Sequence, residues 1–273
     1  MVSRPACGAL FFCPEESAPQ AGRLTIPGKD AGARVFPKPG YYPPMPRALA
    51  LETSGRVGSV ALVLDGAVVA EEQFPHGLKH AAGIIPILDR LCRAQGWAPR
   101  DVEEVYVSAG PGSFTGLRVG ITVAKSLAFT TGAKLVAVPS ADVLARNAPP
   151  GWEHLVIVLD AKREQIFTAV FSNEGGEPVA REPAHLDALS AVLARTPRPV
   201  HLLGEGIPFH DKFIPKDDPG VIVTGAELWQ ARAAAVAQLG HALARRGHFS
   251  DPDRLAPLYV RRPEAEEKFE AKQ

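Results

Sequence analysis

The sequence has few cysteines, no excess charge of either sign and no long apolar run, and each shortage excludes a class of protein. Its three cysteines, Cys7, Cys13 and Cys92, stand at unrelated spacings that predict neither a disulfide framework nor a zinc site. The 30 basic and 30 acidic side chains balance, so no overall field attracts nucleic acid or anionic lipid. The longest apolar run, around 155–160, is too short to span a bilayer. We therefore expect a cytoplasmic protein.

Residues 1–44 differ from the rest of the chain in composition. They contain frequent prolines and no hydrophobic periodicity, so they cannot bury enough apolar surface to offset the entropy of ordering. We predict a disordered, proline-rich extension over these residues. Met45 directly precedes the first patterned segment, which leaves open that translation starts there.

From residue 45 onward, the chain contains two segments built on the same plan. Each begins with a strand, an acidic residue, a polar turn and a second strand, and continues with alternating helices and strands. This order predicts mixed α/β domains. Glu52 and Asp160 occupy the same place in the two segments. The fold class we predict is α/β with two lobes, each a mixed β-sheet with flanking helices.

The lobes have predicted boundaries at Pro149, Pro150 and Gly151, where the pattern restarts. We expect a helix over 186–195 and a long alanine-rich helix over 227–246. This last helix either completes the second lobe or packs back on the first. The predicted segments are the extension 1–44, the N-terminal lobe 45–149, the C-terminal lobe 150–262 and the tail 263–273.

A glycine-rich loop, "SAGPGSFTGLRVG" at 108–120, joins a predicted strand to a predicted helix. It matches neither the dinucleotide fingerprint, because Thr115 replaces the third glycine, nor the phosphate-binding loop, because no G-K-[ST] follows. Small residues instead recur every fourth position, at Gly112, Gly116, Gly120 and Ala124. Such a ridge allows another helix to approach closely. That helix belongs either to a partner or to the same domain.

Several stretches in order resemble the TsaB (YeaZ) family: "LALETSGRVGSVAL", "KHAAGIIPILDRLC", "AGPGSFTGLRVGITVAKSLA" and "VLDAKREQIFTAVF". Near the C-terminus, "PLYVRR" is similar to that family's closing motif. The resemblance implies the two-lobed actin-like ATPase (ASKHA) fold. It also implies a non-catalytic dimerisation subunit of the bacterial complex that forms threonylcarbamoyladenosine in tRNA.

The implied partner is the catalytic relative TsaD, bound as a heterodimer through helices of the N-terminal lobes, with a TsaE-type ATPase in the same complex. We expect tRNA contact only through the complex, and a homodimer remains open for the free chain. The residues that the resemblance and the small-residue ridge assign to the partner interface are His80, Ile84, Leu88, Gly112, Ser113, Phe114, Gly116, Arg118, Gly120 and Ala124.

The resemblance also addresses catalysis, because TsaD-type proteins carry an H-x-x-x-H metal pair after the strand that follows the glycine-loop helix. The matching positions here are Ser140 and Leu144, and neither side chain replaces an imidazole as a ligand of a catalytic metal. We therefore expect no metal site, no catalytic residue and no catalysis by the chain alone.

A vestigial nucleotide site is a further expectation, with weak ATP or ADP binding left open and no firm cofactor. The hydroxyls of the first hairpin turn and the basic second turn are placed to meet phosphate, while Gly204-Glu205-Gly206 faintly resembles an adenosine loop. The residues of this site are Glu52, Thr53, Ser54, Asp160, Lys162 and Arg163. An active ATPase or kinase, with Glu52 and Asp160 positioning magnesium, remains an alternative, as does a metallopeptidase.

Overall fold

The computed structural model describes residues 45–75 and 80–260. The predictions for the 1–44 extension and the 263–273 tail lie outside the described residues. No helix within the described ranges is both long enough and apolar enough to cross a membrane.

The first lobe is built on a five-stranded mixed sheet in the order β3-β2-β1-β4-β5. The first three strands form an antiparallel meander, and β4 and β5 extend it in parallel. The elements of this lobe are β1 (Arg47–Glu52), β2 (Val57–Leu64), β3 (Ala67–Pro75), α1 (His80–Ala94), the 3-10 turn η1 (Pro99–Asp101), β4 (Glu104–Ser108), α2 (Phe114–Thr131), β5 (Lys134–Val138) and α3 (Ser140–Ala145).

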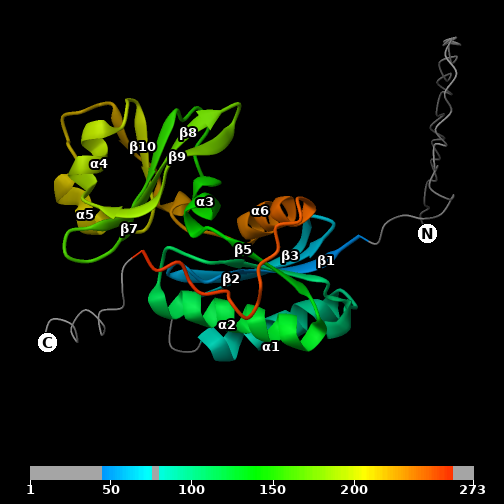
Figure 1. The fold of residues 1–273 in the computed structure, drawn as a ribbon. Coiled ribbons are helices and arrows are strands. Elements are labelled where there is room, and N and C mark those ends of the chain that lie inside the picture. Colours follow the sequence, from blue (N-terminus) through cyan, green and yellow to red (C-terminus); the bar gives the residue numbers. More distant parts are fainter. Residues whose placement is uncertain (1–44, 76–79, 261–273) are drawn as a thin grey trace, which may run out of the picture. The chain divides into compact units, whose positions relative to one another are not determined.

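Alternating side-chain size along β1 decides which helices cover which face of this sheet. Leu49 and Leu51 point into a core shared with α1 and α2, whereas Ala48 and Ala50 face the opposite side. Helices α1 and α2 cover the first face and α6 (Ala233–Arg245) lies on the second (Figure 1). The small alanines let α6 come close to the strands.

Helix α6 follows the second sheet in sequence but packs against strands of the first. Its inner face consists of small residues, and a Cβ on Gly240 would overlap the ring of Tyr106. The single helix expected over 227–246 is instead a short 3-10 turn, η3 (Ala226–Leu228), followed by α6. Of the two packing options for this helix, the structure has the one against the first lobe.

The second lobe repeats the sheet of the first. Strands β6 and β7 are two parts of one strand interrupted at Val158, and both pair antiparallel with β8. Strand β9 pairs with β8 at one edge of the sheet. On the other side of β6, β10 pairs with β6 and β11 pairs with β10, both in parallel. The elements are β6 (His154–Ile157), β7 (Leu159–Asp160), β8 (Ile166–Glu174), β9 (Glu177–Asp187), α4 (Leu189–Arg195), β10 (Val200–Leu203), α5 (Ile207–His210), η2 (Asp211–Phe213) and β11 (Val221–Val223).

The helix predicted over 186–195 begins later than expected, because β9 continues to Asp187 and α4 starts only at Leu189. Strand β9 pairs with a single neighbour and is mostly half-exposed or exposed, so its residues show no apolar run. Its two prolines, Pro178 and Pro183, are tolerated because an edge strand leaves some N–H groups unpaired.

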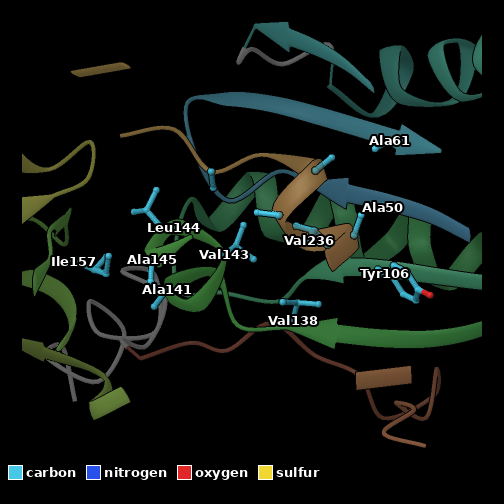
Figure 2. Packing of buried hydrophobic residues seen from close by; sticks show 14 of the residues in the cluster. Ala50, Ala61, Tyr106, Val138, Ala141, Val143, Leu144, Ala145, Ile157 and Val236 are labelled. Carbon is cyan, nitrogen blue, oxygen red and sulfur yellow. The ribbon is translucent and has the colours of Figure 1, made fainter. Parts of the chain in front are cut away.

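One hydrophobic core runs from the α6 face of the first sheet through α3 to β6 of the second lobe (Figure 2). Val143 and Ala145 of α3 and Ile157 of β6 belong to it. The segment after α6 also returns to the first lobe. Ser250 pairs with Leu135, and the Leu258 amide donates to the Ala109 carbonyl over 2.7 Å. The interval 150–262 thus contains segments that pack on the first lobe.

Candidate functional site

The glycine loop before α2 lies against the first hairpin turn of its own lobe. The Ser113 amide donates to the Ser54 carbonyl over 2.7 Å, and Ser113 caps α2 by accepting from the Gly116 amide. A Cβ on Gly116 would overlap the carbonyl oxygen of Thr53, and one on Gly120 would overlap the Thr53 hydroxyl. The prediction that these glycines face a partner helix is therefore wrong, and the alternative of packing within the same domain is correct.

Three further residues assigned to the partner interface lie in the core of the first lobe. Ile84, Leu88 and Ala124 are buried in the cluster that joins α1 and α2 to the sheet. Gly112 lies against Ser54 but is only half-buried. A residue whose surface is covered within its own lobe cannot make the direct contact expected of it. The assignments of Ile84, Leu88 and Ala124 are corrected for the same reason as those of Gly116 and Gly120, whereas that of Gly112 stays a prediction.

Other residues assigned to the interface remain on the surface. Phe114 and Arg118 are exposed on α2, where the Arg118 guanidinium stacks 3.8 Å from the centre of the Phe114 ring. The Arg118 Nε also donates to the Tyr259 hydroxyl over 2.8 Å, so the segment after α6 joins this cluster. His80 begins α1, and its side chain lies outside the described residues.

Sequence reasoning missed two exposed apolar side chains of these helices, Ile85 on α1 and Phe129 on α2. They are 47% and 62% exposed, respectively. Each lies one residue, or about 100° around the helix, from a buried neighbour, Ile84 or Ala128, and so faces away from the core. The ridge of small residues lies on the inner face, where Gly116, Gly120 and Ala124 are buried, so it gave no signal for these exposed side chains.

The two positions that match the metal pair of TsaD-type proteins have roles inside the fold. The Ser140 hydroxyl is buried and accepts from the Gly110 amide over 3.0 Å, which ties α3 to the glycine loop. Leu144 lies in the core between the lobes (Figure 2). Within 45–75 and 80–260, no group of three His, Cys, Asp or Glu side chains could hold a metal ion.

Glu52 ends β1 and is fully buried. Its Oε1 accepts from the Ser54 amide over 2.5 Å and from the Ser54 hydroxyl over 2.6 Å, while Oε2 has no hydrogen-bond partner. Burial raises the pKa of Glu52 above its ordinary value, although the bonds from Ser54 oppose the shift. A covered carboxyl of this kind is not placed to hold magnesium in a cleft.

The hydroxyls of the first hairpin turn are also committed or covered. The Ser54 hydroxyl donates to Glu52, and Thr53 is buried beneath Gly120 of α2. The glycine loop covers these hydroxyls, so in this structure neither is exposed toward a phosphate.

Asp160 ends β7 in the second lobe, at the place that Glu52 has in the first. Its carboxylate accepts from the Lys162 ammonium over 2.7 Å and lies 3.2 Å from Nε2 of the buried His210. Partial burial opposes ionisation, yet the hydrogen bonds from Lys162 and His210 lower the pKa of Asp160. Lys162 and Arg163 both have positive φ in the turn that follows.

The carboxylates beside the two turns have different surroundings, since Glu52 is buried and Asp160 is paired with a cation. The first turn presents no free carboxylate, and the charge of Lys162 in the second is paired with Asp160. Glu205 and Phe209, which contact these turns from the Gly204-Glu205-Gly206 loop and α5, were not predicted as site residues. The glycine spacing around Glu205 was the available signal, whereas nothing in the sequence marked Phe209.

Comparison with known proteins fits this geometry. The TsaD family model, described as tRNA N6-adenosine threonylcarbamoyltransferase, matches residues 76–216. The chain is 30% identical over 226 residues to the tRNA threonylcarbamoyladenosine biosynthesis protein TsaB of Bacillus subtilis (strain 168), covering 81% of this chain and 96% of that protein. The chain belongs to the TsaB family. Its match to the TsaD model places it within the wider group that this model describes.

More distant relatives are consistent with this family and fold. A tRNA N6-adenosine threonylcarbamoyltransferase of Anaeromyxobacter dehalogenans (strain 2CP-C) is 27% identical over 146 residues, covering 46% of this chain and 44% of that protein. The solved structure of YeaZ from Pseudomonas aeruginosa superposes with a TM-score of 0.67 at 24% identity, covering 79% of this chain and all of that one. The two mixed sheets with their flanking helices confirm the two-lobed α/β fold class that the sequence predicts, and the chain shares its fold with YeaZ.

Proposed function

We propose that this TsaB-family chain is a non-catalytic partner subunit in tRNA threonylcarbamoyladenosine biosynthesis, which binds and supports a TsaD-type transferase. One observation carries the proposal: the positions of the catalytic metal pair hold Ser140 and Leu144, and both side chains are built into the fold. A hydroxyl that accepts a backbone amide and a leucine in the core cannot bind a Lewis-acidic metal. The name of the Bacillus subtilis relative, a tRNA threonylcarbamoyladenosine biosynthesis protein, supports a role in that pathway.

The outer face of α1 and α2 is the surface that we assign to the TsaD-type partner. Ile85 and Phe129 expose apolar area there, and the Phe114–Arg118–Tyr259 cluster adds stacked aromatic and cationic groups. Aromatic residues and arginine are enriched at protein interfaces. The same face supports a homodimer when the partner is absent. We further propose that a TsaE-type ATPase and the tRNA are met through the assembled complex.

An active ATPase or kinase is less well supported. That activity needs carboxylates that reach magnesium and turn groups that reach phosphate. Glu52 is buried and accepts a hydrogen bond from the Ser54 hydroxyl. The Lys162 ammonium is paired with Asp160. We infer that any binding of ATP or ADP by the isolated chain is weak. For a metallopeptidase, the described residues supply no ligand set.

A reconstituted modification assay tests the proposed function. Threonylcarbamoyl transfer to tRNA is measured with the TsaD-type protein alone, with this chain alone, and with both, in the presence of the enzymes that supply the activated threonylcarbamoyl group. We expect no product from this chain alone and a higher yield when both proteins are present. Product formed by this chain without the TsaD-type protein would contradict the proposal.

A further inference from the structure

The loop between β10 and α5 presents an acidic side chain to the first lobe. Gly204 and Gly206 hold this loop against the junction of β6 and β7. The Gly206 amide donates to the Val158 carbonyl over 2.9 Å, and a Cβ on Gly206 would lie 2.6 Å from the Asp160 nitrogen. These contacts anchor the backbone on both sides of Glu205, whose side chain is half-buried.

The Glu205 carboxylate meets the first hairpin turn of the other lobe. The Arg56 amide donates to both carboxylate oxygens, over 2.9 Å to Oε2 and 3.2 Å to Oε1. A Cβ on Gly55 would lie 3.5 Å from the same carboxylate. A carboxylate held on a backbone amide of a turn occupies the position that an external anion would take there.

A second contact, from α5, reaches both hairpin turns. The ring of Phe209 is 4.9 Å from the Arg56 guanidinium, which belongs to the first turn, and 5.5 Å from the Lys162 ammonium, which belongs to the second. Cations over an aromatic face are attracted by its quadrupole. Phe209 thus connects a cation of each lobe, four residues beyond the carboxylate that binds the Arg56 amide.

We propose that Glu205 is an internal anionic ligand of the first hairpin turn, and that its contact with Arg56, supported by Phe209, forms a latch between the lobes. The latch has two consequences. It restrains the two turns relative to each other, in addition to the hydrophobic core that runs through α3. It also excludes phosphate-like anions from the Arg56 amide, because a resident carboxylate must first be displaced.

Amide hydrogen exchange in the isolated full-length chain tests the latch without any TsaD-type partner, so its outcome is independent of the proposed function. Exchange at the Arg56 amide is compared between the wild type, Glu205→Ala and Glu205→Gln. The matched control is Asp218→Ala, which removes a carboxylate that accepts from the Gly220 amide within the second lobe. Glu205→Gln keeps the side-chain shape and one acceptor, so it preserves the test if Glu205→Ala fails to fold.

We expect exchange at Arg56 to become about tenfold faster in Glu205→Ala, the change corresponding to loss of one charge-assisted hydrogen bond, and to rise less in Glu205→Gln. Asp218→Ala should leave Arg56 unchanged and affect Gly220. Added inorganic pyrophosphate should restore slow exchange at Arg56 in Glu205→Ala while leaving the wild type unaffected. Unchanged exchange at Arg56 in both Glu205 variants would overturn the latch. Equal protection of wild type and Glu205→Ala by pyrophosphate would overturn the exclusion of anions.

Discussion

At the scale of single residues, Gly116 and Gly120 of α2 pack so closely on the first hairpin turn that no side chain would fit at either position. Gly116 is held against the carbonyl of Thr53, and Gly120 against its hydroxyl. This contact brings the N-terminal half of α2 onto the end of β1, where it buries Glu52, Thr53 and Ser54. The glycines therefore determine how the first hairpin turn is covered.

A pair of identical substitutions on two helices tests this role. Gly116→Ala should lower the free energy of unfolding by about 1–3 kcal/mol, because the new methyl group overpacks against backbone that has little room to move. Gly83→Ala on α1 is the matched control, since a Cβ added there would meet no atom of the described residues within 4 Å. Alanine has the higher helix propensity, so the control should be neutral or stabilising. Equal stability of the two variants in urea unfolding would show that the ridge is not packed internally.

Buried Glu52 leads to a pH-dependent prediction. Because burial raises its pKa in the folded state, Glu52 contributes most to stability below its unfolded pKa, and this contribution is lost as the pH rises through the folded pKa. Glu52→Gln keeps an oxygen that accepts from Ser54 but does not ionise. Its stability relative to the wild type, measured by urea unfolding, should therefore improve between pH 5 and pH 8. A relative stability that stays constant or falls over this range would contradict the burial of an ionisable group.

At the scale of elements, α2 separates two tasks between its faces. The inner face carries the glycines and Ala124, which pack within the lobe. The outer face carries Phe114, Arg118 and Phe129, which remain exposed. An interface variant should consequently be made on the outer face, where a change does not disturb the core.

Charged substitutions on this outer face should weaken partner binding without unfolding the chain. Ile85→Asp and Phe129→Asp each place a carboxylate in the surface that we assign to the TsaD-type protein, and we expect at least tenfold weaker binding from desolvating an unpaired charge. Ile222→Asp on β11 is the control, because Ile222 is an exposed apolar residue, 38% exposed, on a different element. Calorimetry and thermal unfolding measure the two effects. Full affinity in both outer-face variants would place the interface elsewhere.

Elements whose signals are local could be predicted from the sequence. The strands that begin each lobe alternate or run apolar over a few residues, so their order and the matching positions of Glu52 and Asp160 are confirmed. Strand β9 was missed, because an edge strand with charged residues and two prolines shows no such signal. The extent of α4 and of the last helix was overestimated for lack of a clear start signal.

The contacts of the candidate site depend on residues far apart in sequence, and these could not be predicted. A row of small residues looks the same whether it meets a partner helix or, as here, a turn of the same lobe. Glu205 accepts from an amide 149 positions away, and only the folded arrangement of the two lobes brings the groups together. In contrast, the positions that correspond to the metal pair, Ser140 and Leu144, could be identified from the sequence, because they follow from the local alignment of "VAVPSADVLA" at 136–145.

At the scale of the whole molecule, the two lobes have similar sheets but differ in the hairpin turn that follows the first strand of each. Glu52 and Asp160 end equivalent strands, yet one is buried with a raised pKa and the other is paired with Lys162 with a lowered pKa. The first turn is covered by the glycine loop and bound by Glu205. The repeat therefore preserves the two-sheet architecture, while each turn contacts side chains from other parts of the chain. This organisation suits a subunit that meets its partner through the outer faces of α1 and α2, as we propose.

The native mass spectrum of the full-length chain mixed with a TsaD-type protein from the same source tests the central claim most directly. We predict a one-to-one heterodimer that forms at the expense of any homodimer of this chain, and its loss when Ile85→Asp and Phe129→Asp are combined. A mixture that shows only the separate proteins at micromolar concentration would contradict the assignment as a partner subunit.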